Sequence, residues 1–202
     1  MKAPAVFLAL AAFASAAPIP LTDGKTFEGW EGDTAKTWRI ENGAFVGGSV
    51  TETVLHNEFL ATKKSYGNFE LRLKFKLVGT EGFVNGGIQF RSKRIPNHYE
   101  MIGYQADMGE GFYGSLYDES RRNKILAAAD KEVIAKALHL NEWNDYRIRC
   151  EGRHIQLWIN GVQTVDYTEP DEGIATSGQI AVQIHGGAKA EASYKDIVIE
   201  EL

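Results

Sequence analysis

Strict alternation of apolar and charged positions marks residues 69–77, where every odd position is apolar and every even position is charged. A β-strand points successive side chains to opposite faces, so this period of two predicts a strand between a core and water. Residues 146–150 and 155–159 alternate in the same way, and the four residues between them predict a hairpin turn. In this pattern Cys150 falls on the apolar side, so we expect it in the core as a small hydrophobic residue.

Two Asn-Gly pairs, Asn42-Gly43 and Asn160-Gly161, are strong signals for tight hairpin turns between strands. The other segments that read as extended are 86–91, 99–107, 115–119, 179–185 and 194–200. Residues 123–138 differ, because apolar positions recur there at helical spacing, and we expect either a helix or a long covering loop. With no internal repeat and no linker, about ten or more strands predict an all-β fold, a two-sheet antiparallel sandwich.

Composition agrees with this fold class and narrows the function. The chain has 21 Gly, 10 Phe, 8 Tyr and 4 Trp, which suits many short strands joined by turns. The net charge of -5 argues against nucleic acid or anionic lipid as a partner. A single Cys rules out an intrachain disulfide, a Cys-x-x-Cys redox centre and a Cys-rich zinc site.

The N-terminus has the order of a secretory signal peptide: a positive charge at Lys2, an apolar run over residues 5–14 and small residues after it. The run is too short for a membrane-spanning helix, so we expect no membrane anchor. Cleavage after Ala16 leaves residues 17–202 as a single domain, with no cysteine at the cleavage point for a lipid anchor. The expected location is therefore secreted or periplasmic.

Three of the predicted strands carry a pair of polar residues on the face opposite their apolar positions. The pairs are Gln89 with Arg91, Gln105 with Asp107, and Gln183 with His185. A solvent-washed face usually carries Lys, Glu and Thr, whereas amides and mixed charges beside glycine favour a groove that hydrogen-bonds neutral hydroxyls. The alternative is an ordinary polar outer face.

The segment 111–122 concentrates aromatic, acidic and basic residues. Its alternation places Tyr117 and Glu119 on one strand face, and Leu116 and Asp118 on the other. Arg121 follows directly and is a further candidate for ligand binding. The alternative interpretation of this segment is a surface ion-pair cluster.

Several short motifs, taken in order, resemble one known family. They are Asn85-Gly86-Gly87-Ile88-Gln89-Phe90-Arg91, Tyr99-Glu100, Gly103-Tyr104-Gln105-Ala106-Asp107, Gly114-Ser115-Leu116-Tyr117-Asp118-Glu119, Asn141-Glu142-Trp143-Asn144 and Gln183-Ile184-His185-Gly186. The chain resembles the 3-keto-disaccharide (3-keto-glycoside) hydrolase domain family over essentially all of its mature length. The resemblance implies a concanavalin A-like jelly roll whose concave sheet forms a carbohydrate site. The family often has Asn-Ser-Gly where this chain has Asn85-Gly86-Gly87, so this chain lacks the serine hydroxyl at that position.

A sugar oxidised at C3 has an acidic C2 hydrogen, because the ketone delocalises the resulting anion. Hydrolysis can then proceed by C2 proton abstraction, elimination of the C1 substituent and addition of water. We expect His185 as the base, Arg91 as the enolate stabiliser and Asp107 as the group that orients His185 or acts as acid, with Glu119 as the alternative acid. The candidates for binding the sugar are Gln89, Gln105, Gln183, Tyr117, Glu100, Trp158 and Arg121.

Two other functions stay open. A retaining glycosidase needs two carboxylates about 5 Å apart, but no Glu-x-Asp-x-Glu run occurs and Asp118 and Glu119 point to opposite faces. A carbohydrate-binding module without turnover would stack a sugar on a tryptophan, for which Trp158 is the best placed. We expect no cofactor, although His185, Asp107 and Glu119 are suitable ligands for a divalent metal. An oxidoreductase that supplies the keto sugar would be a pathway partner.

Overall fold

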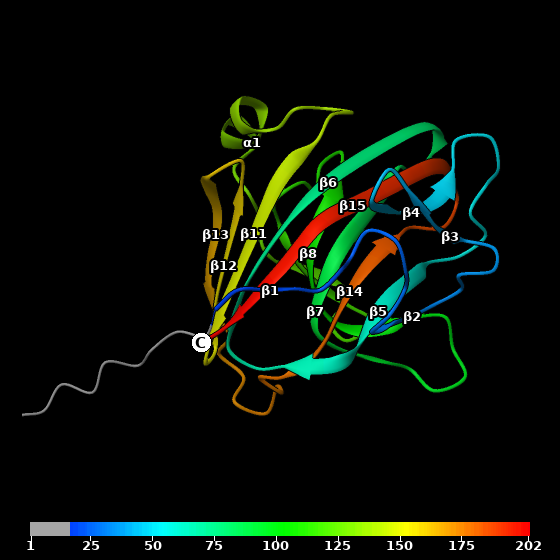
Figure 1. The fold of residues 1–202 in the computed structure, drawn as a ribbon. Helices are drawn as coiled ribbons and strands as arrows, with labels where there is room; N and C mark the ends of the chain where they lie inside the picture. Colours follow the sequence, from blue (N-terminus) through cyan, green and yellow to red (C-terminus); the bar gives the residue numbers. More distant parts are fainter. Residues whose placement is uncertain (1–16) are drawn as a thin grey trace, which may run out of the picture.

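The computed structural model describes residues 17–202, so the expected signal peptide lies outside the described residues. The chain forms two antiparallel sheets packed face to face, with one short helix at the end of the sandwich (Figure 1). The predicted all-β, two-sheet sandwich is therefore confirmed.

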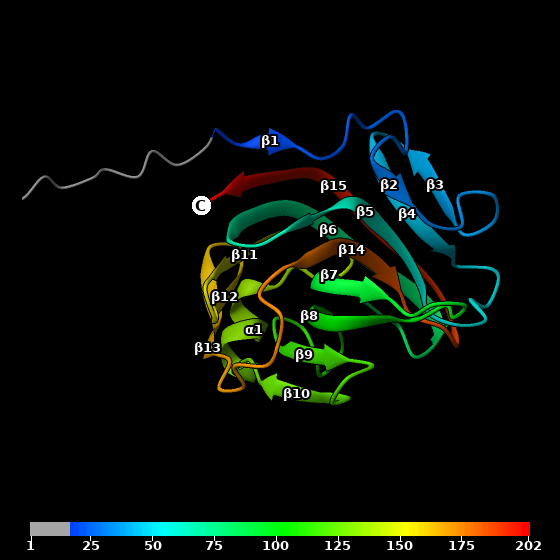
Figure 2. The same ribbon diagram turned by 90° about the horizontal axis from the view of Figure 1, so that it is seen from below.

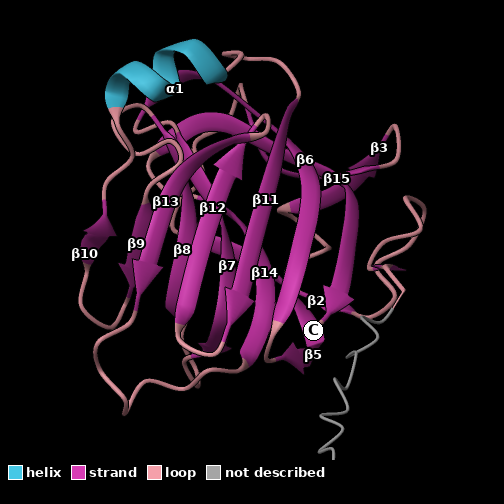
Figure 3. Ribbon diagram, turned by 90° about the vertical axis from the view of Figure 1, so that its left-hand side faces the viewer, coloured by secondary structure: helices cyan, strands magenta, loops and turns pink. Residues whose placement is uncertain are grey.

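The first sheet, called sheet A, has eight strands and is nearest the viewer in Figure 3. Its spatial order is β13-β12-β11-β6-β15-β4-β3, with β1 paired to β15. The strands are β1 (Ile19–Pro20), β3 (Trp38–Glu41), β4 (Ala44–Ser49), β6 (Phe69–Gly82), β11 (Asn144–Glu151), β12 (His154–Ile159), β13 (Val162–Thr168) and β15 (Ala188–Glu201).

The second sheet, called sheet B, has seven strands in the order β10-β9-β8-β7-β14-β5-β2 (Figure 2). They are β2 (Trp30–Glu31), β5 (Glu58–Tyr66), β7 (Asn85–Arg94), β8 (Met101–Gly109), β9 (Leu116–Glu119), β10 (Lys124–Ala127) and β14 (Gly178–Ile184). Segments far apart in sequence thus become neighbours, since β14 inserts between β5 and β7.

The core lies between the two sheets and follows the alternation of the sequence. In β6, Phe69, Leu71 and Leu73 are buried in one large apolar cluster, which also contains Cys150 with no exposed surface. The hairpin predicted from residues 146–150 and 155–159 forms as β11 and β12 in register. Because apolar area removed from water contributes roughly 25 cal/mol per Å², this core provides the main stabilisation of a domain without a disulfide.

Both Asn-Gly turns have the expected left-handed backbone, with φ of 50° and 78° at Asn42 and Gly43 and of 49° and 81° at Asn160 and Gly161.

Residues 123–138 contain both a strand and a helix. β10 extends sheet B, and α1 (Lys131–Ala137) begins at Asp130, whose side chain accepts hydrogen bonds from the N–H groups of Glu132 and Val133.

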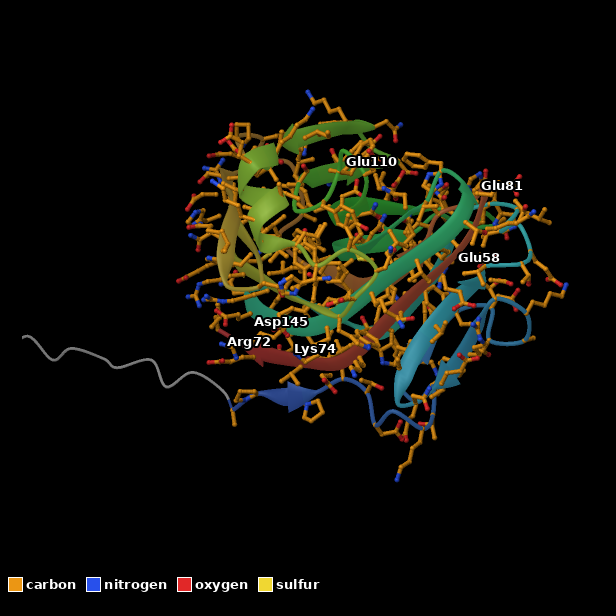
Figure 4. The ribbon with its side chains drawn as sticks, turned by 90° about the horizontal axis from the view of Figure 1, so that it is seen from above. Glu58, Arg72, Lys74, Glu81, Glu110 and Asp145 are labelled. Atoms are coloured by element: carbon orange, nitrogen blue, oxygen red, sulfur yellow. The ribbon has the colours of Figure 1, made fainter. Side chains whose placement is uncertain are left out.

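The outer face of sheet A carries charges that pair with one another. Figure 4 shows Lys74 of β6 beside Asp145 of β11, and their charged atoms lie 2.6 Å apart. Glu70, only 4% exposed, pairs with Arg72, Arg147 and Arg149. This face is a solvent-exposed surface whose charged side chains form ion pairs with one another.

Across residues 17–202, no helix has the length and apolar character needed to cross a bilayer.

Candidate active site

Backbone pairing aligns polar side chains on the outer face of sheet B. Four residues on neighbouring strands lie side by side in one row across the sheet. They are Ala181 of β14, Gln89 of β7, Gln105 of β8 and Tyr117 of β9. Positions two residues away along each strand share that face. We call this surface the polar face, and it consists of Gln89, Gln105, Asp107, Tyr117, Glu119 and Gln183.

Three amides of the polar face are buried and have polar atoms without hydrogen-bond partners in the described chain. Gln89 and Gln183 have no exposed surface and Gln105 has 2%. Within the described chain, both amide atoms of Gln89 and Gln183 and the Gln105 Oε1 atom make no hydrogen bond. Buried amides are nearly always paired, so three neighbouring exceptions indicate groups kept available for a ligand.

The connection between β7 and β8, residues 95–100, reaches the segment before β5, where Tyr99 stacks on His56 and Glu100 accepts a hydrogen bond from Asn57. The Arg94 Nη2 atom donates to the Phe59 carbonyl at 3.0 Å, and Met101 clusters with Phe59, Ala61 and Ala181 on the side away from the main core. The connection therefore covers part of the outer face of sheet B.

The same connection brings Glu100 to the site. The Asn57 Nδ2 atom donates to Glu100 Oε1 at 2.8 Å, while Asn57 Oδ1 accepts from the Gly186 N–H at 3.0 Å. Glu100 Oε2 is buried and accepts no hydrogen bond from the part of the chain that the structure describes. Burial raises the pKa of Glu100, which is opposed by the Asn57 hydrogen bond and by the nearby His98 and His185.

Asp107 is the most buried carboxyl group of the polar face, at 3% exposure. Its Oδ1 atom accepts from Asn85 Nδ2 at 3.0 Å and from the Met108 N–H at 2.8 Å. Burial raises the pKa of Asp107 to about 7, and the nearby Glu119 acts in the same direction. A carboxyl group with this pKa exchanges a proton near neutral pH, as a general acid or base requires.

Glu119 is a second carboxyl group with a raised pKa. Burial raises its pKa to about 7, with a further contribution from the charge of Glu100. The Gln183 amide lies close enough to oppose that shift, although β7 and β8 separate the strands of the two residues. These two side chains therefore lie near each other over sheet B.

His185 follows the end of β14 and is half-buried beside Phe83, with ring centroids 4.8 Å apart. Its Nδ1 atom lies 2.7 Å from the Gly186 carbonyl oxygen. A carbonyl only accepts, so Nδ1 carries the hydrogen and Nε2 of the neutral ring holds the lone pair. The expected orientation of His185 by Asp107 is not observed, because Asp107 bonds to Asn85 and Met108 instead.

Gly87 leaves the space that Gln105 occupies. It lies between Gln183 and Asp107 in register, and a Cβ atom there would come within 2.6 Å of the Gln105 Cγ and Cδ atoms. The absence of a side chain at Gly87 thus allows Gln105 to take its position in the site.

The prediction that Arg91 shares a face with Gln89 is wrong. Arg91 has a left-handed φ of 49°, and the pairing of β7 with β8 shifts between Phe90 and Lys93. A bulge of this kind redirects a side chain. The Arg91 guanidinium instead donates to the Gly67 and Gly152 carbonyl oxygens at the end of the sandwich.

Two predicted binding residues also lie elsewhere. Trp158 does point away from the core, but from sheet A, where Arg147 stacks on it at 4.2 Å. Arg121 pairs with the buried Asp118 and lies over the Tyr104 ring, on the core side of β8. For this part of 111–122, the ion-pair interpretation is the correct one.

No sequence pattern singled out Asn57 or Phe83, and Tyr99 entered only as part of the Tyr99-Glu100 motif. Asn57 connects Glu100 to Gly186, and Phe83 and Tyr99 are aromatic residues with 45% exposure each at the rim of the site. Tyr99 stacks on His56 at 4.4 Å. For Phe83 the sequence offered a signal, because this aromatic residue lies two residues before the Asn85-Gly86-Gly87 segment.

The profile of the 3-keto-alpha-glucoside-1,2-lyase-like domain matches residues 17–200. The chain belongs to this family. The resemblance found in the sequence motifs is thereby confirmed. A search among curated proteins finds no significant match.

Solved structures similar to this family member share its sandwich. A protein from Parabacteroides distasonis ATCC 8503, provisionally described as a glycosyl hydrolase, has 20% identity and a TM-score of 0.67, over 92% of this chain and 94% of its own. The carbohydrate-binding module CBM66 from Bacillus subtilis has 15% identity and a TM-score of 0.67, over 86% and 96%. A Bacillus subtilis protein of galectin-like fold has 13% identity and a TM-score of 0.66, over 94% and 96%.

Within residues 17–202 of this 3-keto-alpha-glucoside-1,2-lyase-like domain, no three His, Cys, Asp or Glu side chains are gathered in a way that would hold a metal ion. The predicted ligand set of His185, Asp107 and Glu119 is thus not assembled as a metal site. The polar face instead offers three titratable groups and three amides.

Proposed function

We propose that this protein cleaves 3-keto-glycosides by elimination across C1 and C2 of the oxidised sugar, followed by addition of water. The observation that carries the proposal is the pair of the buried Asp107 and the half-buried Glu119, whose pKa values are raised to about 7, on a face of buried amides with unpartnered atoms. Membership of the 3-keto-alpha-glucoside-1,2-lyase-like family supports the same reaction. The N-terminal pattern supports a secreted or periplasmic enzyme.

The substrate requires two proton transfers and a stabilised oxyanion. Removing the C2 proton creates an enolate whose charge rests on the C3 oxygen, and the C1–O bond breaks as the C1–C2 double bond forms. The departing oxygen takes a proton, and water then adds to the unsaturated sugar. General acid–base groups and hydrogen-bond donors serve these steps.

His185 is the proposed base. Its Nε2 lone pair is available because Nδ1 donates to the Gly186 carbonyl, and Phe83 packs against the ring. The hydrogen bond fixes both the tautomer and the ring orientation.

Glu119 is the proposed acid for the leaving oxygen, and Asp107 the donor to the enolate oxygen. Glu119 is half-buried, while Asp107 is nearly inaccessible and fixed through one oxygen. A buried protonated carboxyl can donate a strong hydrogen bond to an oxyanion. With Arg91 directed elsewhere, Asp107 and the amide N–H groups of Gln105 and Gln183 take the stabilising role.

The remaining contacts suit a sugar. Gln89, Glu100 and Tyr117 present hydrogen-bonding groups for hydroxyls, and Phe83 and Tyr99 offer exposed rings on which a sugar can stack.

The deciding experiment incubates the purified protein with a 3-keto-glucoside and its unoxidised parent in deuterated water. Elimination predicts release of the C1 substituent and deuterium at C2 for the keto sugar alone. Release from the unoxidised parent, or product without C2 deuterium, would contradict the mechanism.

Carbohydrate binding without turnover is the second candidate. The observations in its favour are the exposed rings of Phe83 and Tyr99 and the fold shared with CBM66. Binding of the unoxidised glycan with no product from the keto sugar would favour it.

A further inference from the structure

A cavity of about 630 Å³ lies at the start of β14, away from the polar face, and has no part in the proposed reaction. Its walls come from β5, the bulged end of β7, the loop before β14 and residues near the end of β9. The basic residues among them are Lys63, Arg91, Lys93 and Arg121, and within residues 17–202 no Asp or Glu is among the lining residues.

Two of these cations are free and exposed. Neither Lys63 nor Lys93 forms an ion pair within the described chain, although the protein as a whole has a net charge of -5. Flexible ammonium groups without partners are available to an incoming anion.

Arg91 adds a buried positive charge without a carboxylate. It is 5% exposed, and its guanidinium is held by the neutral carbonyl oxygens of Gly67 and Gly152. Burial lowers the pKa of Arg91, as expected for a cation without a compensating charge.

Several acids border the cavity, and each has a partner. Asp171 and Glu172 precede the lining residue Gly173: Asp171 accepts from the Gly173 N–H at 2.8 Å, and Glu172 pairs with Arg153. Asp118 pairs with Arg121 and Arg122. Glu31 pairs with Arg94, although it also accepts from Gln179 Nε2 at 3.3 Å. The excess positive charge of the cavity therefore rests on Lys63, Lys93 and Arg91.

Neutral donors complete the lining. The hydroxyl groups of Ser65 and Ser177 face no hydrogen-bond partner in residues 17–202. Ammonium and hydroxyl donors around an open space suit the several oxygens of a carboxylate or sulfate.

We propose that this cavity is a second ligand site that binds an oxyanion, a carboxylate or sulfate group, in particular one carried by an acidic sugar. Gln179 at its edge lies on the same strand face as Gln183, four residues and about 13 Å away. The site is separate from the polar face but lies along the same sheet.

Calorimetric titration at low salt with glucuronate, inorganic sulfate and glucose tests the proposal. We expect glucuronate and sulfate to bind and glucose not to bind at this site. In the double variant Lys63→Met, Lys93→Met, both anions should bind at least about tenfold more weakly, because two charge-assisted contacts are lost. Lys131→Met, an exposed lysine on α1, is the matched control and should bind like the parent.

The proposal is overturned if neither anion binds to the parent protein, or if the double variant binds both as tightly as Lys131→Met does. Binding of glucuronate alone would support the acidic-sugar form of the proposal, and equal binding of both anions would support a general oxyanion site. Turnover of a neutral 3-keto-glucoside should be unchanged in the double variant, so this test is independent of the proposed reaction.

Discussion

The two outer faces of the sandwich are both polar, yet their acids are in opposite situations. On sheet A, burial alone would raise the pKa of Glu70, but hydrogen bonds and charges from Arg147, Arg72 and Arg149 bring it below the ordinary value. On sheet B, no cation among residues 17–202 pairs with Asp107, and burial raises its pKa to about 7. A polar face alone therefore does not identify a ligand site. Buried carboxyl groups without a positively charged partner, and buried amides without hydrogen-bond partners, do identify one.

Substituting one acid on each face gives the largest expected contrast. Asp107→Asn should lower turnover of a 3-keto-glucoside at least about 100-fold, because an amide donates a weaker hydrogen bond to the enolate oxygen than a protonated carboxyl group does. Glu70→Gln should leave turnover near normal but lower the free energy of unfolding by about 1 kcal/mol, since its arginine partners are partly exposed. Steady-state kinetics and urea denaturation measure the two effects. Similar turnover in both variants would remove the functional distinction between the faces.

The pH dependence of stability should also separate the faces. The folded-state pKa of Asp107 is about 7, above the unfolded value of about 3.9, so the native state holds an extra proton between these values. Its stabilising contribution is complete below about pH 4 and is lost as the pH rises through 7. We compare the free energy of unfolding of Asp107→Asn with that of the parent at each pH. The variant-minus-parent difference should be more favourable to the variant at pH 8 than at pH 4, by on the order of 2 kcal/mol.

The measurement is urea denaturation of the parent and of Asp107→Asn at pH 4, 6 and 8. Glu119→Gln should behave in the same direction, because its pKa is also raised to about 7. A difference in free energy between parent and variant that does not change with pH would show that these carboxyl groups do not titrate as proposed.

Adding a methyl group at Gly87 tests whether the site needs the space that this glycine leaves for the Gln105 side chain. Gly87→Ala should displace Gln105 and reduce kcat/KM about tenfold, corresponding to one lost hydrogen bond to the ligand. Gly67→Ala is the control, since the nearest atom to its added Cβ is 3.9 Å away. Equal kinetics in the two variants would exclude a role for the Gln105 position.

The smallest effect is expected at the rim. Phe83→Leu should raise KM about threefold with little change in kcat, because stacking on the ring contributes to binding alone. Trp158→Leu removes an aromatic residue from sheet A and should change neither constant. A larger KM effect at Trp158 than at Phe83 would place sugar binding on the other face.

Alternation predicted the strands and most of the polar face, because a period of two fixes which side chains share a face wherever pairing is regular. It failed at Arg91, where a left-handed residue and a bulge break that period. For Trp158 the face was predicted correctly, but its sheet depends on long-range pairing that no local pattern encodes. The approach of Asn57 to Glu100 likewise depends on a connection that crosses a neighbouring strand.

The strands β7 and β8 supply both the floor of the site and, through residues 95–100, its cover. Local opening of that hairpin would therefore expose the ligand and loosen Gln89, Gln105 and Asp107 in the same event. Amide hydrogen exchange in the connection and in the two strands should then slow together when a ligand binds, as expected for one cooperative unit of unfolding.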